Sequence, residues 1–316
     1  MVKLTVMVKR QFNLLQLLGV VCTVACLILF IWRPSFPTPD KLVVFLTFVF
    51  MIFGQAREML KRLVPFVALL LVYESFRGIA HNLNSHVNYT LAPRIDRLIF
   101  GKLPADYLQR WLWRGHTQWY DIALYIPYML FFVVPLGLAI LVWKTKDHYY
   151  WRVVATYMVL FFSAFLTFIL FPAAPPWLAA QHHAIEPVVR ISSYVWFSLG
   201  IHNFPSVYNH IAPNPVAAIP SLHSGCATLF SIFIFKLYGR RWGLISTLYP
   251  ILIYIGVVYE GEHYAFDVMA GIVYAVLAYI LTPKLITLAQ RAIAKSKYSS
   301  STKTASKLTK SKQSTS

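Results

Sequence analysis

Two short histidine motifs are the residues of this chain whose types and spacing best suit chemistry. The first motif is Pro220-Ser221-Leu222-His223-Ser224-Gly225, and the second is His263-Tyr264-Ala265-Phe266-Asp267. Between them run two apolar stretches, 226–238 and 242–259, joined by the basic turn Gly239-Arg240-Arg241. This pattern predicts a membrane hairpin, because each stretch is apolar and the turn is charged. A hairpin returns both histidines to one membrane face, where we expect a polar site.

The spacing of His263 and Asp267 suits a nucleophilic histidine. On a helix these residues are four positions apart and share one face, within reach of a hydrogen bond. An aspartate bonded to one ring nitrogen fixes the tautomer and directs the other nitrogen outward. Such an imidazole can attack phosphorus and form a phosphohistidine, while His223 would protonate the leaving oxygen and then activate the acceptor. Ser221 predicts a helix start, where free backbone N–H groups favour a phosphate.

Simpler interpretations of the same residues stay open at this stage. A histidine and an aspartate at a membrane interface can be solvated groups, and the spacing H-x3-D also arises by chance. The placement of both motifs at span ends favours function, because ionisable residues are rare in an otherwise apolar chain. Glu260 and Glu262 would orient a catalytic histidine or bind an acceptor hydroxyl, or they are solvated carboxylates. Four further histidines are more typical of ordinary loop residues than of ligands: His182, His183, His202 and His210.

The elements that must position these residues are membrane helices. The 316-residue chain is 58% hydrophobic and 13% charged, with a mean hydropathy of +0.58, which excludes a soluble domain. We predict an all-α, polytopic integral membrane helical bundle, because most apolar stretches reach the roughly 17 to 25 residues that cross a bilayer. The expected spans are 12–32, 38–54, 63–80, 120–143, 149–171, 217–238, 242–259 and 264–281. The second is the weakest, since Pro37, Pro39, Asp40 and Lys41 crowd one end, so seven spans is the alternative to eight.

Two segments outside the spans are long enough to take part in a site. The motif Phe171-Pro172-Ala173-Ala174-Pro175-Pro176-Trp177 ends one span on the histidine face and opens the proline-rich segment 172–215, which is typical of a lid or a binding element. The segment 81–119 contains two predicted amphipathic interfacial helices, at 98–100 and 108–113. Its cations lie on the side that membrane proteins disfavour, so they either bind an anionic group or snorkel to headgroups.

The net charge of +18 is distributed beside the membrane spans, so we expect no nucleic-acid partner. If both termini are cytoplasmic, 20 of the 29 Lys and Arg residues lie inside, as the positive-inside rule requires. This topology places all three motifs on the extracytoplasmic or lumenal face. Residues 284–316 are rich in Ser, Thr and Lys, which predicts a disordered basic tail that sets the orientation or contacts anionic lipid.

The cysteines predict neither a disulfide framework nor a metal site. Cys22 and Cys26 lie one turn apart in the first span, and Cys226 starts another. The sequence also has no glycine-rich phosphate loop, so we expect no cofactor. No small-residue cleavage site follows the first span, so we expect a membrane anchor rather than a removed signal peptide.

Together these motifs resemble the type 2 phosphatidic acid phosphatase superfamily, whose signature comprises K-x6-RP, PSGH and SR-x5-H-x3-D. Pro220-Ser221-Leu222-His223 matches the second block with Leu222 in place of glycine, and His263 with Asp267 matches the end of the third. The resemblance is closer to the inositol phosphotransferase branch, which includes fungal inositol phosphorylceramide synthase and many bacterial membrane proteins. The segments that carry it are 171–177, 220–228, 261–264 and Asp96-Arg97-Leu98-Ile99-Phe100-Gly101.

This resemblance implies a fold and a division of roles. It covers about 63–283, which would be a catalytic membrane domain with six core spans, and it leaves 1–62 as one or two additional N-terminal spans. In the family, the third-block histidine is the nucleophile, the aspartate orients it, and the second-block histidine handles the leaving-group proton. Carried over, those roles fall on His263, Asp267 and His223.

The departures from the family pattern concern the cations that bind phosphate. Gly256 and Val257 stand where the third block has Ser and Arg, and no K-x6-RP precedes the second block. The transition state still needs positive charge around its oxygens, so other cations must supply it. The lipid phosphotransferase branches share this loss, which favours transfer over hydrolysis. The candidate phosphate- and substrate-binding residues are Arg94, Arg97, Arg190, Ser221, Ser224, Pro176, Trp177 and Glu262.

The sequence therefore predicts a membrane lipid phosphotransferase that moves a phosphoryl or phosphoinositol-type headgroup from a lipid donor to an alcohol through a metal-independent phosphohistidine. The acceptor would be inositol, another polyol, a lipid hydroxyl or water. With water as acceptor, the protein would be a lipid or polyprenyl phosphate phosphatase. A lipid transporter or scramblase is a remote alternative, because the polar residues gather at span ends rather than at mid-membrane in repeated halves.

Overall fold

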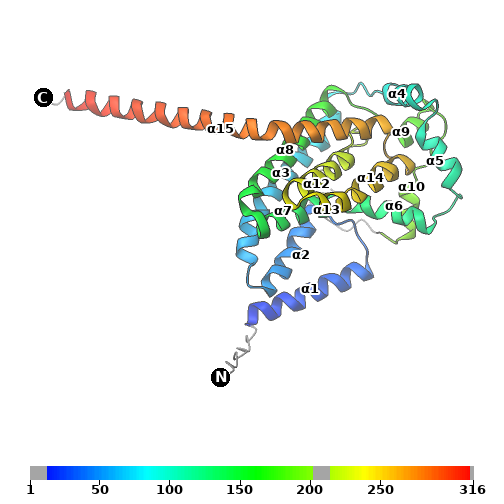
Figure 1. Cartoon of the computed structure of the whole chain (residues 1–316), viewed down its shortest axis with the longest axis horizontal. Coiled ribbons are helices and arrows are strands. Elements are labelled where there is room, and N and C mark those ends of the chain that lie inside the picture. Colours follow the sequence, from blue (N-terminus) through cyan, green and yellow to red (C-terminus); the bar gives the residue numbers. More distant parts are fainter. Residues whose placement is uncertain (1–12, 202–213, 314–316) are drawn as a thin grey trace.

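The computed structural model describes residues 13–201 and 214–313, which Figure 1 shows as a bundle of helices with α15 extending beyond it. Apart from isolated bridges that pair Ala173 with Asn88 and with Ala217, the regular structure of these residues is helical. The helices are α1 (Leu14–Trp32), α2 (Pro39–Ile52), α3 (Ala56–Leu83), α4 (Leu91–Phe100), α5 (Pro104–Leu112), α6 (Trp119–Met129), α7 (Val133–Lys146), α8 (Tyr150–Leu170), α9 (Pro176–Gln181), α10 (Ile191–Ser198), α12 (Leu222–Tyr238), α13 (Arg240–Ser246), α14 (Leu248–Tyr259) and α15 (Ala265–Gln313). The prediction of an all-α bundle is confirmed for this part of the chain.

Several of these helices are long and apolar enough to cross a membrane. In the described residues there are five such stretches: Leu14–Trp32, Ala56–Ala80, Val133–Leu170, Arg240–Tyr259 and Ala265–Lys295, with α12 as a shorter apolar helix. The stretch Val133–Leu170 has 38 residues, nearly twice the ~20 that one crossing needs. It comprises α7, a 3-10 turn at Asp147–Tyr149 and α8. The chain is therefore a multi-pass integral membrane protein.

The predicted span 120–143 is divided into α6 and α7 by a turn at 130–132. The N–H of Leu130 donates to the carbonyls of both Ile126 and Pro127, which closes α6. Pro135 lies in the first turn of α7, where its missing N–H leaves no intrahelical bond unmade. This break brings Tyr128 and Phe131 to the wall of a cavity that His223 also lines.

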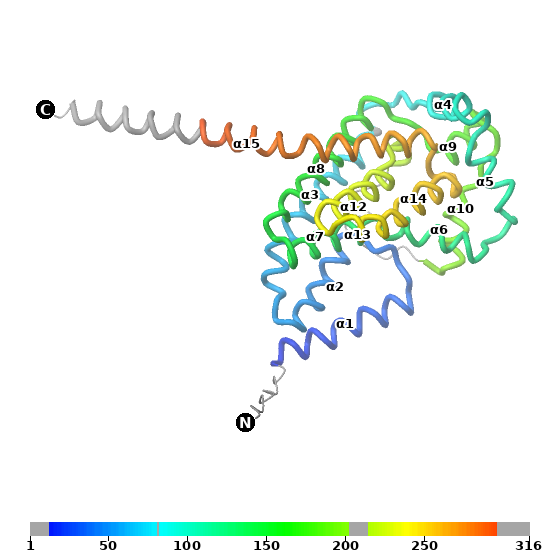
Figure 2. Tube along the Cα trace, in the orientation of Figure 1, coloured from blue at the N-terminus to red at the C-terminus, as the bar shows by residue number. Residues whose placement is uncertain are grey.

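The two helices that carry the histidine motifs approach each other at Gly271. A Cβ atom added there would lie 2.1 Å from Ser224 Oγ and 2.2 Å from Ser221 O, so only glycine allows this packing. The Ser221 N–H also donates to the Asp267 carbonyl, at 3.0 Å. The N-terminal turns of α12 and α15 are therefore held side by side. The Cα trace in Figure 2 follows these two helices as neighbours within the bundle.

The N-terminal helices α1 and α2 form a hairpin beside the bundle. They pack closely at Gly19, where a Cβ would lie 2.9 Å from Met51 Cβ. The connection between them carries Phe36, whose ring stacks on Trp196 of α10 at 6.1 Å and meets Phe132 edge-on at 6.3 Å. We had expected 1–62 to be an addition to the catalytic domain. The loop between α1 and α2 contributes Phe36 to the lining of the cavity described below.

The C-terminal helix is longer than the sequence predicts. Disorder was expected from residue 284 onwards, but α15 continues as a helix past Pro283 and projects away from the bundle (Figure 1). The residues that follow Pro283 up to Gln313 include neither glycine nor proline, and many are alanine, leucine and lysine, which favour helix. The disorder of the tail outside the bundle stays a prediction.

Candidate active site

His263 and Asp267 lie at the start of α15. His263 precedes the first helical residue, and its N–H donates to the Val257 carbonyl at 3.0 Å. Asp267 is fully buried, and its Oδ2 accepts the N–H of Tyr264 at 2.9 Å. The same Oδ2 lies 3.5 Å from His263 Nδ1, which is longer than a tight hydrogen bond, and the contact is an ion pair only when the imidazole is protonated. Because Nδ1 faces Asp267, Nε2 is the ring nitrogen left for a substrate.

Asp96 of α4 ties the interfacial segment to the same helix start. Its Oδ1 accepts the N–H of Phe266 at 2.8 Å, and its Oδ2 accepts the N–H of Ala265 at 3.0 Å. These are the first N–H groups of α15, which have no partner within the helix. Burial raises the pKa of Asp96 to about 6, although the two N–H bonds oppose that shift. Asp96 therefore caps α15 from another helix, a contact that sequence spacing does not reveal.

His223 lies in the first turn of α12, which begins after the N-cap Ser221. Its imidazole stacks on the Tyr128 ring at a centroid distance of 4.1 Å and an angle of 14°, and it contacts the Phe131 ring at 4.5 Å. The His263 ring lies 5.8 Å away at 58°. The structure thus brings together the two histidines that the hairpin pattern places on one face.

The serines of the first motif form hydrogen bonds within α12 and between α12 and α15, and they do not face the cavity. Both are fully buried. Ser221 Oγ accepts the N–H of Ser224 at 3.4 Å, as an N-cap does. Ser224 Oγ donates to the carbonyls of Ser221 and Val268, at 2.9 and 3.1 Å. Neither serine lines the cavity described below, so the structure does not support their prediction as substrate contacts.

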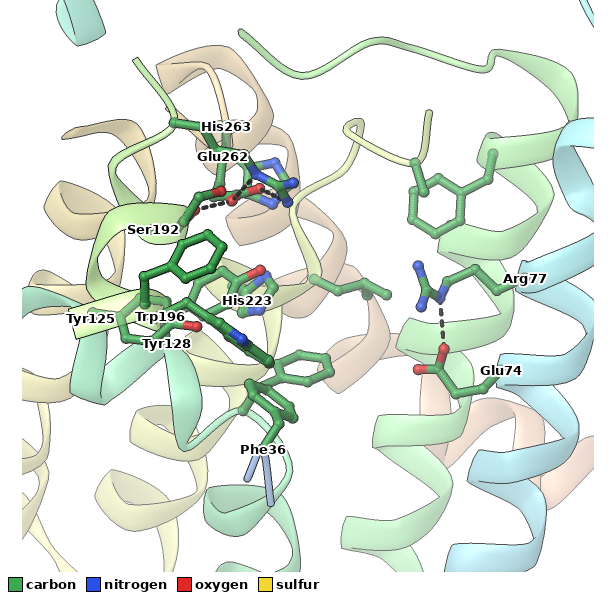
Figure 3. Close-up of a pocket in the computed structure, with 17 residues that line it drawn as sticks. Phe36, Glu74, Arg77, Tyr125, Tyr128, Ser192, Trp196, His223, Glu262 and His263 are labelled. Atoms are coloured by element: carbon green, nitrogen blue, oxygen red, sulfur yellow. Dashed lines mark hydrogen bonds and ion pairs between the residues drawn. The ribbon is translucent and has the colours of Figure 1, made fainter. Parts of the chain in front are cut away.

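A cavity of about 560 Å³ opens beside the two histidines (Figure 3). Its walls come from α3, α6, α8, α10, α12 and the segments next to them. The described residues that line it are Phe36, Glu74, Arg77, Tyr125, Tyr128, Phe131, Phe168, Arg190, Ser192, Ser193, Trp196, Phe197, Ala217, Leu222, His223, Glu262 and His263. The cavity is therefore aromatic over much of its surface, with a few charged groups, as expected for a site that holds an amphipathic ligand.

Arg190 and Glu262 form the charged wall beside His263. The Arg190 guanidinium donates two bonds to the Glu262 carboxylate, at 2.8 and 3.2 Å. Ser192 donates a further hydrogen bond to the same carboxylate. The guanidinium also lies over the Trp177 ring, 4.3 Å from its centroid. Arg190 and Glu262 are thus in the predicted site, and Trp177 supports Arg190 from behind.

The proline-rich motif fixes this wall to the histidine loop. Pro176 is buried at the first position of α9, where proline suits a helix start. The Trp177 N–H donates to the Gly261 carbonyl at 3.2 Å. Gly261 has a φ of 75°, and a Cβ there would lie 2.7 Å from the Val189 carbonyl, so the turn requires glycine. Pro176 and Trp177 position the wall and do not themselves line the cavity.

The structure places Arg94 and Arg97 away from the cavity, contrary to the expectation that they bind phosphate. Both lie on α4, which is amphipathic and exposes the neighbouring Leu98 at 84%. Arg94 is exposed, and Arg97 pairs with Glu186. Helix α4 buries Asp96 against α15, while Arg94 is exposed and Arg97 is partly exposed. Neither arginine is among the described residues that line the cavity, and their role in binding phosphate stays a prediction.

The remaining polar candidates also lie outside the cavity. Glu260 is fully buried and does not line it, and burial raises the pKa of this carboxyl well above its usual range. His182 and His183 are exposed, and the His182 ring contacts Tyr89. His202 and His210 lie outside the described residues. Among the described carboxylates and histidines of segments 172–201 and 260–267, Glu262 and His263 line the cavity.

Sequence reasoning missed the far wall of the cavity. Glu74 and Arg77 of α3 line it opposite Glu262 and Ser192 (Figure 3). The sequence did contain a sign of these cavity residues, because two charged residues lie inside the apolar stretch 63–80. The aromatic residues Tyr128 and Phe131 were also missed, since nothing in an apolar run distinguishes a cavity wall from a lipid-facing surface.

Fold and site together define a multi-pass helical membrane enzyme with a paired-histidine centre. The chain belongs to the PAP2 superfamily, whose family model matches residues 94–281. It is 26% identical to the phosphoinositol dihydroceramide synthase of Bacteroides thetaiotaomicron over 242 residues, which are 71% of this chain and 76% of the relative. It is 25% identical to the inositol phosphorylceramide synthase catalytic subunit AUR1 of Saccharomyces cerevisiae over 209 residues, 62% of this chain and 48% of that protein. No solved structure matches the chain.

Proposed function

We propose that this protein is a membrane lipid phosphotransferase that moves a phosphoryl or phosphoinositol-type headgroup from a lipid donor to an alcohol. The observation that carries the proposal is the pair of imidazoles 5.8 Å apart beside one cavity, with Asp267 behind His263. The similarity to two synthases named for inositol-containing sphingolipids supports transfer. The sequence also has Val257 in place of the arginine of the third block, and this departure supports transfer as well.

The first half-reaction loads His263. Its Nε2 attacks the donor phosphorus, and the bond from phosphorus to the leaving lipid oxygen breaks with its electron pair on that oxygen. Protonated His223 supplies the proton that the leaving oxygen needs, and becomes neutral. Asp267 stabilises the positive charge on the His263 ring through Nδ1, 3.5 Å away.

The second half-reaction returns both histidines to their starting states. Neutral His223 takes the proton of the acceptor hydroxyl, whose oxygen attacks phosphorus. The N–P bond then breaks with its electron pair on Nε2 of His263. The same residue acts as acid and then as base, as a double displacement through one site requires.

Charge on the phosphate oxygens needs positive partners on the histidine side of the cavity. Arg190 lines the cavity there, although its pairing with Glu262 offsets its charge. The first turn of α12, where His223 lies, adds backbone N–H groups at the positive end of a helix. These two features are our candidates for the phosphate-binding role within the cavity, which Arg94 and Arg97 do not line.

We further propose that the cavity faces the extracytoplasmic or lumenal side, with both termini cytoplasmic. The support is the charge count of the sequence, in which the tail and the basic turn at Arg240 and Arg241 lie opposite the histidines. Accessibility labelling tests this directly. A cysteine introduced at Arg241 should react only after the cytoplasmic side is exposed.

The test of function is a product analysis with purified protein. Lipid donors with a phosphoinositol or a plain phosphate headgroup are incubated with and without a ceramide-type or polyol acceptor, and products are identified by phosphorus NMR and mass spectrometry. The proposal predicts an acceptor-dependent phosphodiester product. Release of free phosphate alone would assign the protein as a phosphatase, and no turnover of either donor would overturn the proposal.

A further inference from the structure

An ion pair is buried in the last third of a membrane helix. Glu74 and Arg77 lie three residues apart on α3, inside the span Ala56–Ala80, with Arg77 Nε 2.6 Å from Glu74 Oε2. Their side chains are only 2% and 17% exposed. Moving two charges out of water costs several kcal/mol per ion by general estimates, and the mutual attraction often does no more than offset it. A pair in this setting is therefore poorly explained by stability alone.

The same helix contains a matched pair that needs no such explanation. Glu58 and Lys61 are also three residues apart and in contact at 2.8 Å, but their side chains are 59% and 55% exposed. An exposed pair of this kind contributes little and costs little. The two pairs share spacing and charge and differ in burial, so burial beside the cavity is the feature that requires an explanation.

The buried pair forms the wall of the catalytic cavity that faces the histidines. Glu74 and Arg77 line the same cavity as His223 and His263, and Figure 3 shows them across from Ser192 and Glu262. A ligand whose phosphorus lies at His263 would extend its remaining polar groups across this space. The cavity, at about 560 Å³, is of the size that holds a small ring-shaped ligand together with its phosphate.

The chemistry of the pair selects hydroxyl groups over a second phosphate. A carboxylate in contact with a guanidinium has no excess positive charge, so it offers little attraction to a phosphate dianion. It does offer an acceptor and donors side by side, which suits a polyol whose hydroxyl groups both donate and accept. Charged partners make the stronger hydrogen bonds of this kind.

We propose that Glu74 and Arg77 form a polyol subsite of the cavity, which binds the hydroxyl groups of a polyol headgroup or a free polyol. The subsite rests on the proposed function, because it presupposes that the phosphorus of the ligand reacts at His263. It makes Glu74 and Arg77 specificity-determining residues, which select polyol-containing substrates over lipids that carry a bare phosphate.

The experiment compares Glu74→Gln with the matched control Glu58→Gln in three assays. The first measures kcat/KM with a phosphatidylinositol donor. The second measures kcat/KM for hydrolysis or transfer with phosphatidic acid, which has no headgroup polyol. The third measures the KM of free inositol as an acceptor with phosphatidic acid as donor. Wild-type transfer to an acceptor in the first or the third assay establishes the proposed function separately from the subsite, whereas hydrolysis of phosphatidic acid alone does not.

The expected result is a loss of about 10- to 100-fold for Glu74→Gln wherever a polyol takes part, the effect of one hydrogen bond to a charged group. Activity on phosphatidic acid alone should change less than about threefold. A loss confined to phosphatidylinositol assigns the subsite to the donor headgroup, and a loss confined to inositol assigns it to a free polyol. An equal loss in all assays, or none in any, overturns the proposal.

A second variant distinguishes a folding defect of Glu74→Gln from loss of the subsite. Glu74→Gln leaves Arg77 without its carboxylate partner in a buried site, whereas the double variant Glu74→Gln/Arg77→Gln removes both charges together. The double variant should retain phosphatidic acid turnover and lose the preference for polyol substrates. If it keeps the wild-type preference, the subsite is elsewhere in the cavity and the proposal fails.

Discussion

The ring centroids of His263 and His223 lie 5.8 Å apart, and the two rings have contrasting surroundings. Behind His263 is the buried carboxylate of Asp267, 3.5 Å from Nδ1. His223 instead packs against the rings of Tyr128 and Phe131. Among the described residues, no carboxylate forms an ion pair with His223.

This difference assigns different chemistry to two residues of the same type. A carboxylate behind one ring nitrogen fixes the tautomer and stabilises the cation that forms when the other nitrogen makes a bond, which suits a nucleophile. An imidazole between aromatic rings has its orientation fixed by packing, while its charge is not stabilised by a neighbouring anion. Beside His263, this imidazole is placed to give a proton to the leaving oxygen and then to take one from the acceptor hydroxyl, which is the role proposed for it above.

The largest expected effect is that of His263→Ala. Removing the nucleophile should lower kcat by at least about 10⁴-fold for every donor, whatever its leaving group, because no bond to phosphorus can form. His183→Ala, an exposed loop histidine, is the matched control and should behave as wild type. Steady-state kinetics with both variants checks this, and substantial activity in His263→Ala would remove the residue from the reaction.

The effect of His223→Ala should depend on the leaving group. Loss of a general acid costs about 10²–10⁴-fold when the leaving group is a lipid alcohol. With a nitrophenol leaving group, which needs no proton, the first half-reaction should recover most of its rate. Burst kinetics with the two donors measures the contrast. If both donors lose the same factor, His223 is not the acid.

Asp267→Asn should produce a smaller loss, on the order of 10²-fold in kcat, with little change in KM. An amide cannot stabilise the His263 cation, and it can hold the ring in the wrong tautomer. The carboxylate contact of 3.5 Å is longer than a tight hydrogen bond, so the loss should fall short of that for removing the nucleophile. A KM effect without a kcat effect would argue that Asp267 only caps α15 through Tyr264.

Tyr128→Leu should give the smallest effect of the series. The ring stack on His223 is worth about 0.5–1.5 kcal/mol, so its loss should lower kcat by roughly threefold to tenfold. Tyr128→Phe keeps the ring and should retain nearly full activity. If both variants lose activity equally, the hydroxyl rather than the ring is what matters, and aromatic packing does not orient His223.

The proximity of the two histidines could be predicted from the sequence. Two membrane crossings separate them, and an even number of crossings returns the chain to the same membrane face. An apolar stretch, a basic turn and a second apolar stretch bring His223 and His263 to one end of a hairpin, whatever the details of packing. The helical class of the fold follows equally directly from the length and apolarity of the stretches. These conclusions depend on patterns along the chain, which the sequence contains in full.

Placements that depend on how helices face one another could not be predicted in this way. The sequence suggests Arg94 and Arg97 as phosphate ligands, but it does not reveal that Asp96 between them caps α15 or that neither arginine lines the cavity. Ser224 had the right chemistry for a ligand, yet the close approach at Gly271 uses its hydroxyl between two helices. Glu74 and Arg77 could have been found, because charges within an apolar stretch are a recognised signal of function.

The most direct test of the central claim is to identify the residue that carries the phosphorus during turnover. His223→Ala protein is mixed with a nitrophenyl ester of the donor phosphate, quenched in alkali because phosphohistidine is acid-labile, digested and mapped by mass spectrometry. The account predicts an adduct on His263 that is absent from His263→Ala protein. An adduct on any other residue, or turnover of this donor without a phosphorylated histidine, would contradict it.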